Sequence, residues 1–314
     1  MTNRIQRFIA FLLVLCIPIF AIAGCTNNDV ANAANQVTTN ANGTYSIDTK
    51  TTTPEGKLDV YMLDIGQGDA ILLKVGDEYS MIDTGDIEHR ENIVAQLKTM
   101  GVTKLKNIII THPHADHMGG FYAIAKAMPI KHVYDDGIAV DNNMYKTYEK
   151  WIEKNKIQRT TLRSGDVVDF GHGAVFIVYA PWVEPLTDKK GETDLNNNSI
   201  VGKLIFGKFS MLFTGDAELQ EEKKLIKEQN SRLFSRILKV GHHGSRTSSS
   251  EDFLKSIKPE SALISNGMYN KYGHPHDVTL RRLQENNIAI YRTDTMGRIH
   301  ISTDGNEWQI TTER

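Results

Sequence analysis

The chain is 314 residues long and 40% hydrophobic, enough to bury a large core in one large domain or two modest ones. Its 36 basic and 38 acidic residues give a formal net charge of −2, so no global field attracts polyanions. Any contact with nucleic acid must therefore rest on a local basic patch, because phosphate neutralisation by Lys and Arg supplies most non-specific affinity.

The N-terminus has the pattern of a secretory signal peptide. Two arginines precede an apolar run over residues 8–20, which is shorter than the roughly 20 residues that cross a bilayer. The small residues directly before Cys25 are similar to the cleavage box of bacterial lipoproteins. We therefore expect residues 1–24 to be removed and Cys25 to carry a lipid that anchors the protein to the outer face of the cytoplasmic membrane. An ordinary signal peptide cut near Ala23 is the alternative, and it would change only the anchoring.

Cleavage would also narrow the chemistry that the chain can perform. It would take away Arg4, Arg7 and Cys16, which leaves 34 basic against 38 acidic residues, about minus four with histidine neutral. With Cys25 acylated, the mature chain keeps no free thiol. That excludes disulfides, cysteine nucleophiles and cysteine zinc sites together, so the chemistry must use other side chains.

Residues 25–56 are dominated by Asn, Thr and Ala, with few aromatic or branched aliphatic side chains to bury. This composition predicts a flexible, disordered tether that holds the folded body, residues 57–314, away from a membrane surface. A disordered terminus without consequence predicts the same flexibility and stays an alternative.

From Lys57 onward, short β-like runs alternate with helical periodicity. The spacing of Ile93, Leu97 and Met100 predicts a helix before Gly101. The other predicted helices cover 143–155, 217–228, 250–257 and 276–286, and the predicted strands cover 58–64, 70–75, 79–82, 107–111, 175–179, 199–206, 210–213, 236–240, 262–265, 288–291 and 298–302. Mixed strands and helices in two successive halves indicate two sheets packed together with helices outside.

Seven of the eleven histidines fall in three short clusters: His112, His114 and His117; His242 and His243; His274 and His276. The first cluster follows the strand predicted over 107–111 and includes Asp116. Imidazoles two residues apart can lie on one side of a tight loop, and Asp116 and His117 then turn back toward the same point. Neutral imidazole nitrogen and carboxylate oxygen suit zinc, manganese or iron, so this segment predicts a site for one or two divalent metal ions.

The segment Thr111-His112-Pro113-His114-Ala115-Asp116-His117 resembles the hallmark of the metallo-β-lactamase superfamily. Four more segments, 63–70, 81–85, 212–216 and 239–245, are similar to the hydrolase domain of the competence DNA-uptake channel protein ComEC. The membrane channel that accompanies that domain is missing, so the chain resembles a free-standing relative attached by lipid. The resemblance implies an α/β protein with a four-layer αββα sandwich and the chemistry of a metal-dependent hydrolase.

The resemblance assigns six residues as metal ligands: His112, His114, Asp116, His117, Asp216 and His242. Asp216 would bridge two metals, and His242 would complete the site that holds Asp116 and His117. Without the resemblance, Asp216 could equally be a loop-end turn residue. Because adjacent histidines on an extended loop point to opposite sides, His243 is expected to lie behind the ligands.

Most members of the superfamily place a further metal histidine where this chain reads Asp194-Leu195-Asn196-Asn197-Asn198-Ser199, as the competence-like branch does. One metal site, that of His112 and His114, therefore looks depleted. A carboxamide oxygen, expected from Asn197, is a harder and weaker ligand than imidazole, so this site would load poorly or prefer manganese to zinc. A polar turn capping Ser199 is the alternative interpretation.

Four residues in or near the predicted metal site have further expected roles. Asp83, at the end of the strand predicted over 79–82, resembles the carboxylate that orients a ligand histidine in the superfamily, although it could be an Asp-Thr-Gly turn. Asp69 flanks a Gly-rich bend and is interpreted as structural. His274 is expected to give substrate a proton or a hydrogen bond, with a plain loop histidine as the alternative. Asp116 is the second catalytic candidate, as a group that passes protons.

The favoured function is hydrolysis of phosphodiesters, DNA or another nucleic acid, by metal-activated water, by analogy with the competence branch. Basic residues that lie near the metal loops in sequence give modest support: Lys239, Arg246, Lys271, Arg281 and Arg282. Two alternatives stay open, a hydrolase of cell-envelope phosphoesters of the phosphocholine or teichoic-acid type and a catalytically inert module that binds an envelope partner. No protein partner is evident, and the membrane is expected as a partner only through the lipid anchor.

Overall fold

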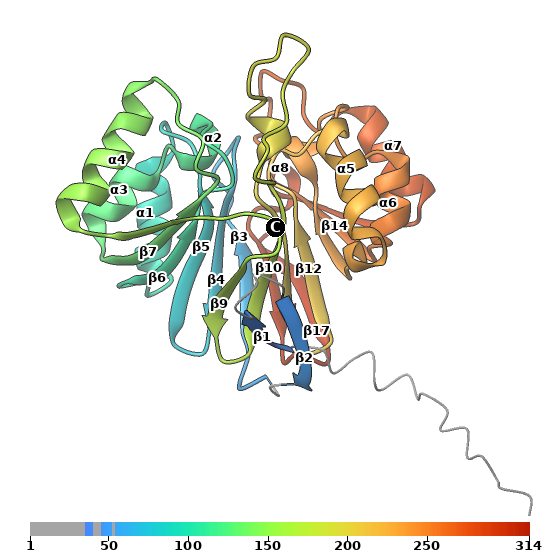
Figure 1. The fold of residues 1–314 in the computed structure, drawn as a ribbon, viewed down its shortest axis with the longest axis horizontal. Helices are drawn as coiled ribbons and strands as arrows, with labels where there is room; N and C mark the ends of the chain where they lie inside the picture. The colour runs from blue at the N-terminus through green and yellow to red at the C-terminus, as the bar shows by residue number, and fades with distance from the viewer. Residues whose placement is uncertain (1–34, 40–44, 52–53) are drawn as a thin grey trace, which may run out of the picture.

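The computed structural model describes residues 35–39, 45–51 and 54–314. The chain from Leu58 onward forms two large β-sheets (Figure 1). Eight strands form the first sheet, in the order β17-β16-β3-β4-β5-β6-β7-β8. Their bounds are Trp308–Thr312, Ile299–Thr303, Leu58–Met62, Ala70–Val75, Glu78–Thr84, Leu105–Ile109, Ile130–Asp135 and Gln158–Thr161. Neighbours from β17 to β5 are antiparallel, and neighbours from β5 to β8 are parallel.

Seven strands form the second sheet, in the order β15-β14-β13-β12-β11-β10-β9. Their bounds are Ala289–Arg292, Ser261–Ile264, Ile237–Lys239, Phe209–Phe213, Val201–Phe206, Ala174–Ala180 and Val167–Gly171. Neighbours from β15 to β12 are parallel and the others are antiparallel. Each sheet therefore has one parallel half and one antiparallel half.

Helices cover the outer face of each sheet. The first sheet carries α1 (Arg90–Thr99), α3 (Phe121–Ala127) and α4 (Asn143–Asn155), and the second carries α5 (Leu219–Gln229), α6 (Glu251–Ile257) and α7 (Asp277–Glu285), as Figure 1 shows on its left and right. One-turn helices α2 (Ala115–Met118) and α8 (Thr293–Met296) and the 3₁₀ turns η1 (Asn196–Asn198), η2 (Asn230–Leu233) and η3 (Gly241–Gly244) occupy loops. The predicted four-layer αββα sandwich is confirmed.

Three apolar clusters hold the layers together. The central one joins the two sheets, with Met62 and Ile82 from the first facing Phe176 and Phe213 from the second. The other two lie between each sheet and its helices. Because both faces of each sheet are covered, the inner strand β4 is apolar apart from Lys74 and shows no alternation of apolar and polar residues.

The predicted tether contains a short hairpin. Strands β1 (Asn35–Thr39) and β2 (Tyr45–Thr51) pair antiparallel, which differs from the expectation of a segment without secondary structure. Several Thr, Val and Ile residues in these two segments favour strands, a local preference that the Asn-rich composition concealed. Cys25 and the predicted signal peptide lie outside the described residues. In the part of the chain that is described, no helix combines the length and apolar character needed to span a bilayer.

The parallel halves of the two sheets set the position of the polar loops. Loops that leave the carboxyl ends of parallel strands meet at one edge of a sheet. In Figure 1, α2, which follows β6, and α8, which follows β15, lie at the upper edge of the molecule. Polar segments from both halves of the chain therefore meet at this edge.

Candidate metal centre

The first histidine cluster lies on the loop after β6. His112 is fully buried, and α2 begins shortly after it. Nε2 of His112 lies 2.9 Å from Nδ1 of His114, so the two imidazoles face one point, as predicted from their spacing. The turn of α2 brings back His117, which is also fully buried, and Asp116, which is partly exposed.

Asp216 follows β12 in the other sheet and lies between the two parts of this cluster. Its Oδ1 is 3.2 Å from Nε2 of His117, and its Oδ2 is 3.8 Å from Nε2 of His112. The turn before it is tight, because Gly215 has a φ of +48° and a Cβ there would meet Ser199 at 2.9 Å. The Asp216 amide donates a hydrogen bond to Ser199 Oγ at 3.1 Å, which fixes the carboxylate with one oxygen toward each part of the cluster.

Of the two histidines after β13, His243 faces the other metal donors and His242 lies at the rim, whereas the prediction made His242 the ligand and placed His243 behind it. His243 is buried, and its Nε2 lies 3.3 Å from Asp116 Oδ2 and 3.6 Å from Asp216 Oδ1. Its Nδ1 donates to the Ser265 carbonyl at 2.9 Å, which leaves Nε2 with a lone pair for a metal. The rings of His242 and His243 do diverge, but η3, with φ values of +48° and +54° at these residues, turns His243 inward. The sequence alone does not show this turn.

His242 lies at the rim of the cluster. Its Nδ1 is 3.0 Å from Glu218 Oε1, and its Nε2 is 3.7 Å from Asp216 Oδ2. That oxygen is the one that faces His112 and His114. His242 is therefore placed beside the depleted side of the centre and not on the side to which the resemblance assigned it.

The donor atoms form two groups that share one carboxylate. Within each group, the donor atoms all lie within 4.8 Å of one another: Asp116, His117, Asp216 and His243 form the first, and His112, His114 and Asp216 the second. Three of these atoms are buried without a hydrogen-bond partner among the described residues, namely His117 Nε2, His243 Nε2 and Asp216 Oδ1. Buried imidazole nitrogens and a carboxylate oxygen that converge without a hydrogen-bond partner fit a divalent metal ion.

Electrostatics also favours a cation here. Burial alone would raise the pKa of Asp216, but the imidazoles of His117 and His243 hold that pKa well below its usual range. Burial opposes the charged form of His117, yet the carboxylates of Asp216 and Asp83 raise its pKa well above the ordinary value. The pKa of His112 lies well below its usual range, because the ring is buried and lies beside His117. The carboxylates thus stay anionic and favour a positive charge between them.

Asp83 supports the cluster from behind, where the resemblance expected it. Its Oδ2 is 2.8 Å from Nδ1 of His117, and its Oδ1 accepts a hydrogen bond from the Thr111 amide at 2.7 Å. Desolvation by burial raises the pKa of Asp83, although the adjacent His117 opposes the rise. The contact orients the His117 ring so that Nε2 faces Asp216.

Asp69 and Lys239 correct two sequence interpretations. Lys239 was expected near substrate, but its side chain is 1% exposed and its Nζ lies 2.6 Å from Oδ2 of the equally buried Asp69. Asp69 was interpreted as a bend residue, yet its Oδ1 lies 3.5 Å from Nδ1 of His243. The pair therefore supports the metal histidines from behind. One sequence signal was available, because Lys239 is the only charged residue of the apolar strand β13.

The asparagine run also differs from the expectation. Asn197, the residue expected beside the metals, is buried and turned to its own loop: its Nδ2 donates to Asp194 at 2.8 Å and its Oδ1 accepts from the Glu221 amide at 3.0 Å. Asn196 lines the cavity over the metal donors instead, with an Oδ1 that has no hydrogen-bond partner among the described residues. The single turn η1 sets this alternation, which residue spacing alone does not reveal.

A cavity of about 330 Å³ lies over the donors, lined by Gln67, His114, Ala115, Asp116, Asn196, Asp216, His242, His243, Tyr272 and His274. His274 is 9% exposed, and its ring stacks on that of Tyr272 at a centroid distance of 5.6 Å. Burial and the neighbouring imidazoles of His243 and His242 lower the pKa of His274 to about 4. The ring is then neutral at neutral pH, so it can donate a hydrogen bond but is a poor source of a proton.

The sequence model of the metallo-beta-lactamase superfamily matches residues 63–267, the stretch that carries the two donor groups up to Asp216 and His243. The chain belongs to the metallo-beta-lactamase superfamily. Its fold and its two donor groups are those of a metal-dependent hydrolase of this superfamily, as the resemblance implied. A solved superfamily structure, the metallo-beta-lactamase fold protein YhfI from Bacillus subtilis, superposes with a TM-score of 0.53 at 11% identity, covering 77% of this chain and 99% of that one. At that identity the likeness shows the fold alone.

Two relatives of known name are competence proteins of the ComEC type. The chain is 30% identical over 247 residues to competence protein ComA of Neisseria gonorrhoeae, covering 78% of this chain and 32% of that protein. It is also 30% identical over 264 residues to ComE operon protein 3 of Bacillus subtilis, covering 78% of this chain and 33% of that protein. The predicted resemblance to the ComEC type is confirmed, and the chain spans about a third of the length of these relatives.

Proposed function

We propose that the protein hydrolyses phosphodiesters, with a nucleic acid as the substrate. One observation carries the proposal: the Asp216 carboxylate directs Oδ1 toward His117 and His243 and Oδ2 toward His112 and His242, over a single cavity. Two cations held on either side of this carboxylate, one by Asp116, His117 and His243 and one by His112 and His114, would stabilise both the attacking and the leaving oxygen of a phosphodiester. Zinc and manganese are the metals proposed.

A divalent cation in this centre would generate a nucleophile from water near neutral pH and polarise the phosphoryl oxygen. The chain itself supplies position and proton handling. Asp116 faces the cavity and is held anionic, since the imidazoles of His243 and His117 outweigh burial and lower its pKa. A lowered pKa makes Asp116 a weak base, so it is proposed to pass a proton onward from the cavity and not to retain it. His274 is proposed to hydrogen-bond a substrate oxygen from the cavity wall.

The choice of substrate rests on the relatives. One of them is named a competence protein and the other a ComE operon protein, which favours a nucleic acid over an envelope phosphoester. The proposed place of action is the outer face of the cytoplasmic membrane, reached through a lipid on Cys25. No further partner is proposed beyond the substrate and the membrane that holds the lipid.

The test is a substrate panel with the purified protein loaded with zinc or manganese. Single-stranded DNA, RNA and bis(p-nitrophenyl) phosphate should be hydrolysed, and Asp216→Asn should lower kcat/KM about 100-fold or more, since loss of a group that only supports a ligand already costs about 10- to 100-fold. Asp77→Asn, at a side chain that is 97% exposed, is the matched control.

Two results would reject the proposal. Turnover confined to phosphocholine or teichoic-acid esters would assign the protein to envelope phosphoesters. A protein that retains well under one equivalent of transition metal and hydrolyses none of the substrates would be an inert binding module.

A further inference from the structure

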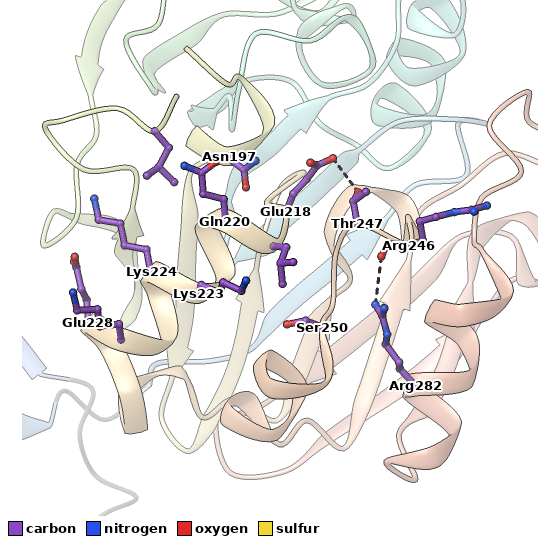
Figure 2. A pocket seen from close by; sticks show the side chains of 13 residues that line it. Asn197, Glu218, Gln220, Lys223, Lys224, Glu228, Arg246, Thr247, Ser250 and Arg282 are labelled. Carbon is purple, nitrogen blue, oxygen red and sulfur yellow. Dashed lines mark hydrogen bonds between the residues drawn. The ribbon is translucent and has the colours of Figure 1, made fainter. Parts of the chain in front are cut away.

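A second and larger cavity, of about 830 Å³, adjoins the metal centre (Figure 2). Its walls are Leu186, Asn197, Glu218, Leu219, Gln220, Lys223, Lys224, Lys227, Glu228, Arg246, Thr247, Ser250 and Arg282. We call it the α5 groove. Glu218 belongs to this wall and bonds His242 of the metal cavity at 3.0 Å, and Asn197 of the groove is next in sequence to Asn196 of the metal cavity. The two cavities therefore adjoin.

The α5 groove is basic although the whole chain carries a formal net charge of −2. Its wall holds five cationic side chains, Lys223, Lys224, Lys227, Arg246 and Arg282, against two carboxylates. In Figure 2 the labelled lysines extend from α5 on one side and Arg282 lies on the other, while Arg246 belongs to the same wall as Arg282 and its side chain is directed away from α5. A linear polyanion between these walls would meet positive charge on both sides.

The two carboxylates offset this charge only in part, because five cations face two anions and each carboxylate is turned to another partner. Glu218 accepts from Thr247 Oγ1 at 2.9 Å and faces His242, and Glu228 accepts from the indole of Trp182. Among the described residues, no ion pair forms at Lys223 or Lys227. These cations repel one another unless an anion lies between them, so the groove is built for a ligand that carries negative charge.

Arg246 and Arg282 complete the opposite wall in different ways. Arg282 is held in place, with Nη1 donating to the Ser248 carbonyl at 3.1 Å. Arg246 is exposed, and its backbone amide donates to His276 at 3.0 Å, which fixes the loop but leaves the guanidinium without an ion-pair partner in the described part of the chain. A guanidinium presented in this way suits a phosphate, which it can bind with two parallel hydrogen bonds.

We propose that the α5 groove binds the phosphates of a nucleic-acid strand next to the phosphodiester that is cleaved. This inference rests on the proposed function and names the path of its substrate. Lys223 and Lys227 are one helical turn apart, with a rise of about 6 Å that is comparable to the spacing of successive phosphates in an extended strand. Tyr272, 51% exposed on the metal cavity, already stacks on His274 and has Lys271 Nζ 5.0 Å from its ring centroid, so a base that stacks there would take the place of the mobile lysine head, a contact that envelope phosphate polymers cannot make.

The binding test compares two charge reversals on equivalent helical spacings. Lys223→Glu/Lys227→Glu lies in the groove, and Lys150→Glu/Lys154→Glu on α4 is the matched control, with both lysines exposed on the other helical layer. The probe is a single-stranded phosphorothioate oligonucleotide that resists cleavage, with the metal-loaded protein. The groove variant should bind at least 10-fold more weakly at low salt, and its plot of log K against log salt should flatten by about 1.4, two phosphate contacts at about 0.7 each. Lys223→Gln/Lys227→Gln should lie between the native and reversed forms.

Kinetics then separates this inference from the proposed function. On the groove variant, kcat/KM should fall at least 10 times more for a single-stranded oligonucleotide than for bis(p-nitrophenyl) phosphate, which is too small to reach the groove from the metals. If the native protein cleaves both substrates and the two charge reversals behave alike, the inference is overturned while the proposed function stands. If the native protein cleaves neither, the proposed function fails, and the salt dependence of binding still decides whether the groove holds a strand.

A further result would reject the nucleic-acid assignment. Purified teichoic acid that displaces the oligonucleotide at lower phosphate concentration, with its own binding lost in the groove variant, would make the groove a site for an envelope polymer. An uncharged methylphosphonate oligonucleotide provides the last control. If it bound the native protein as tightly as the phosphorothioate, the groove would not act through phosphate charge and the inference would be wrong.

Discussion

The buried pair of Lys239 and Asp69 gives the sharpest test of how the centre is supported. Lys239→Met keeps most of the aliphatic chain and removes the ammonium group. That group lies 2.6 Å from the Asp69 carboxylate, and it also donates to the Val240 carbonyl at 2.9 Å. Both charged side chains are at most 2% exposed, so solvent does not screen them. The substitution therefore leaves a buried carboxylate without its main counter-charge.

The size of the effect follows from what remains around Asp69. Breaking a buried ion pair by removing one partner costs about 3–5 kcal/mol. Here the imidazoles of His243 and His117 lie 3.5 and 3.9 Å from the carboxylate and compensate in part. We expect the free energy of unfolding to fall by about 3 kcal/mol, the lower end of that range. Asp69→Asn, which strands the ammonium group, should have a similar cost.

Urea unfolding of the single and double variants in chelator checks this value. If the two charges stabilise each other, Asp69→Asn/Lys239→Met should lose clearly less than the sum of the single losses, with a coupling of at least about 1.5 kcal/mol. Metal-loaded samples add a second readout, since a displaced His243 should weaken metal binding. Additive losses within about 0.5 kcal/mol would refute the reasoning, because the pair would then not act as a pair.

Three further outcomes are expected. Glu221 is fully buried, and burial raises its pKa well above the usual value, so the folded state holds a proton that the unfolded state releases above about pH 4.5. The free energy of unfolding should therefore fall with rising pH, by up to about 1.4 kcal/mol per pH unit. Glu221→Gln should remove that slope in urea titrations between pH 5 and 8. A pH-independent difference would contradict it. His243→Ala should weaken metal binding in a chelator competition more than His242→Ala, since only His243 lies in the buried group of four donors; the reverse order would restore the original assignment. Gly68→Ala should lower the free energy of unfolding by about 2 kcal/mol and weaken metal binding, because at a φ of +121° its Cβ would meet the Asp116 carbonyl at 2.5 Å. An unchanged melting temperature and metal affinity would show that the loop adapts.

Sequence reasoning worked best where local signals determine structure. Helix α4 has the predicted bounds, 143–155, because Asn142 caps it by accepting from the Tyr145 amide at 2.8 Å and Lys156 ends it in the left-handed region. Strand β4 also matches its apolar run over 70–75. Elements such as α3 and β7 to β9 were missed, since short segments with mixed burial lack a clear period.

In the candidate metal centre, too, the features set by nearby residues were predictable from the sequence and those set by distant contacts were not. The HxHxDH spacing places four donors on one short loop, so their convergence is a local property that a sequence can show. The inward direction of His243 depends on the left-handed backbone of His242 and His243 and on the hydrogen bond to the Ser265 carbonyl. A single 3₁₀ turn, η1, decides that Asn196 and not Asn197 lines the cavity over the metal donors. The α5 groove was missed because lysines on an amphipathic helix look like an ordinary solvated face until the opposite wall is known.

The two sheets together determine the geometry of the centre. Thr111 of the first half binds Asp83 and lies 3.1 Å from Nδ1 of His112, while Ser199 of the second half lies 3.3 Å from the same nitrogen and accepts from the Asp216 amide. One imidazole is thus held from both sheets. The distance from the loop after β6 to Asp216 and His243 of the second sheet then depends on the apolar layer between the sheets, which is close-packed and does not deform continuously. Metal affinity should therefore follow the packing of that layer, even for side chains that touch no ligand.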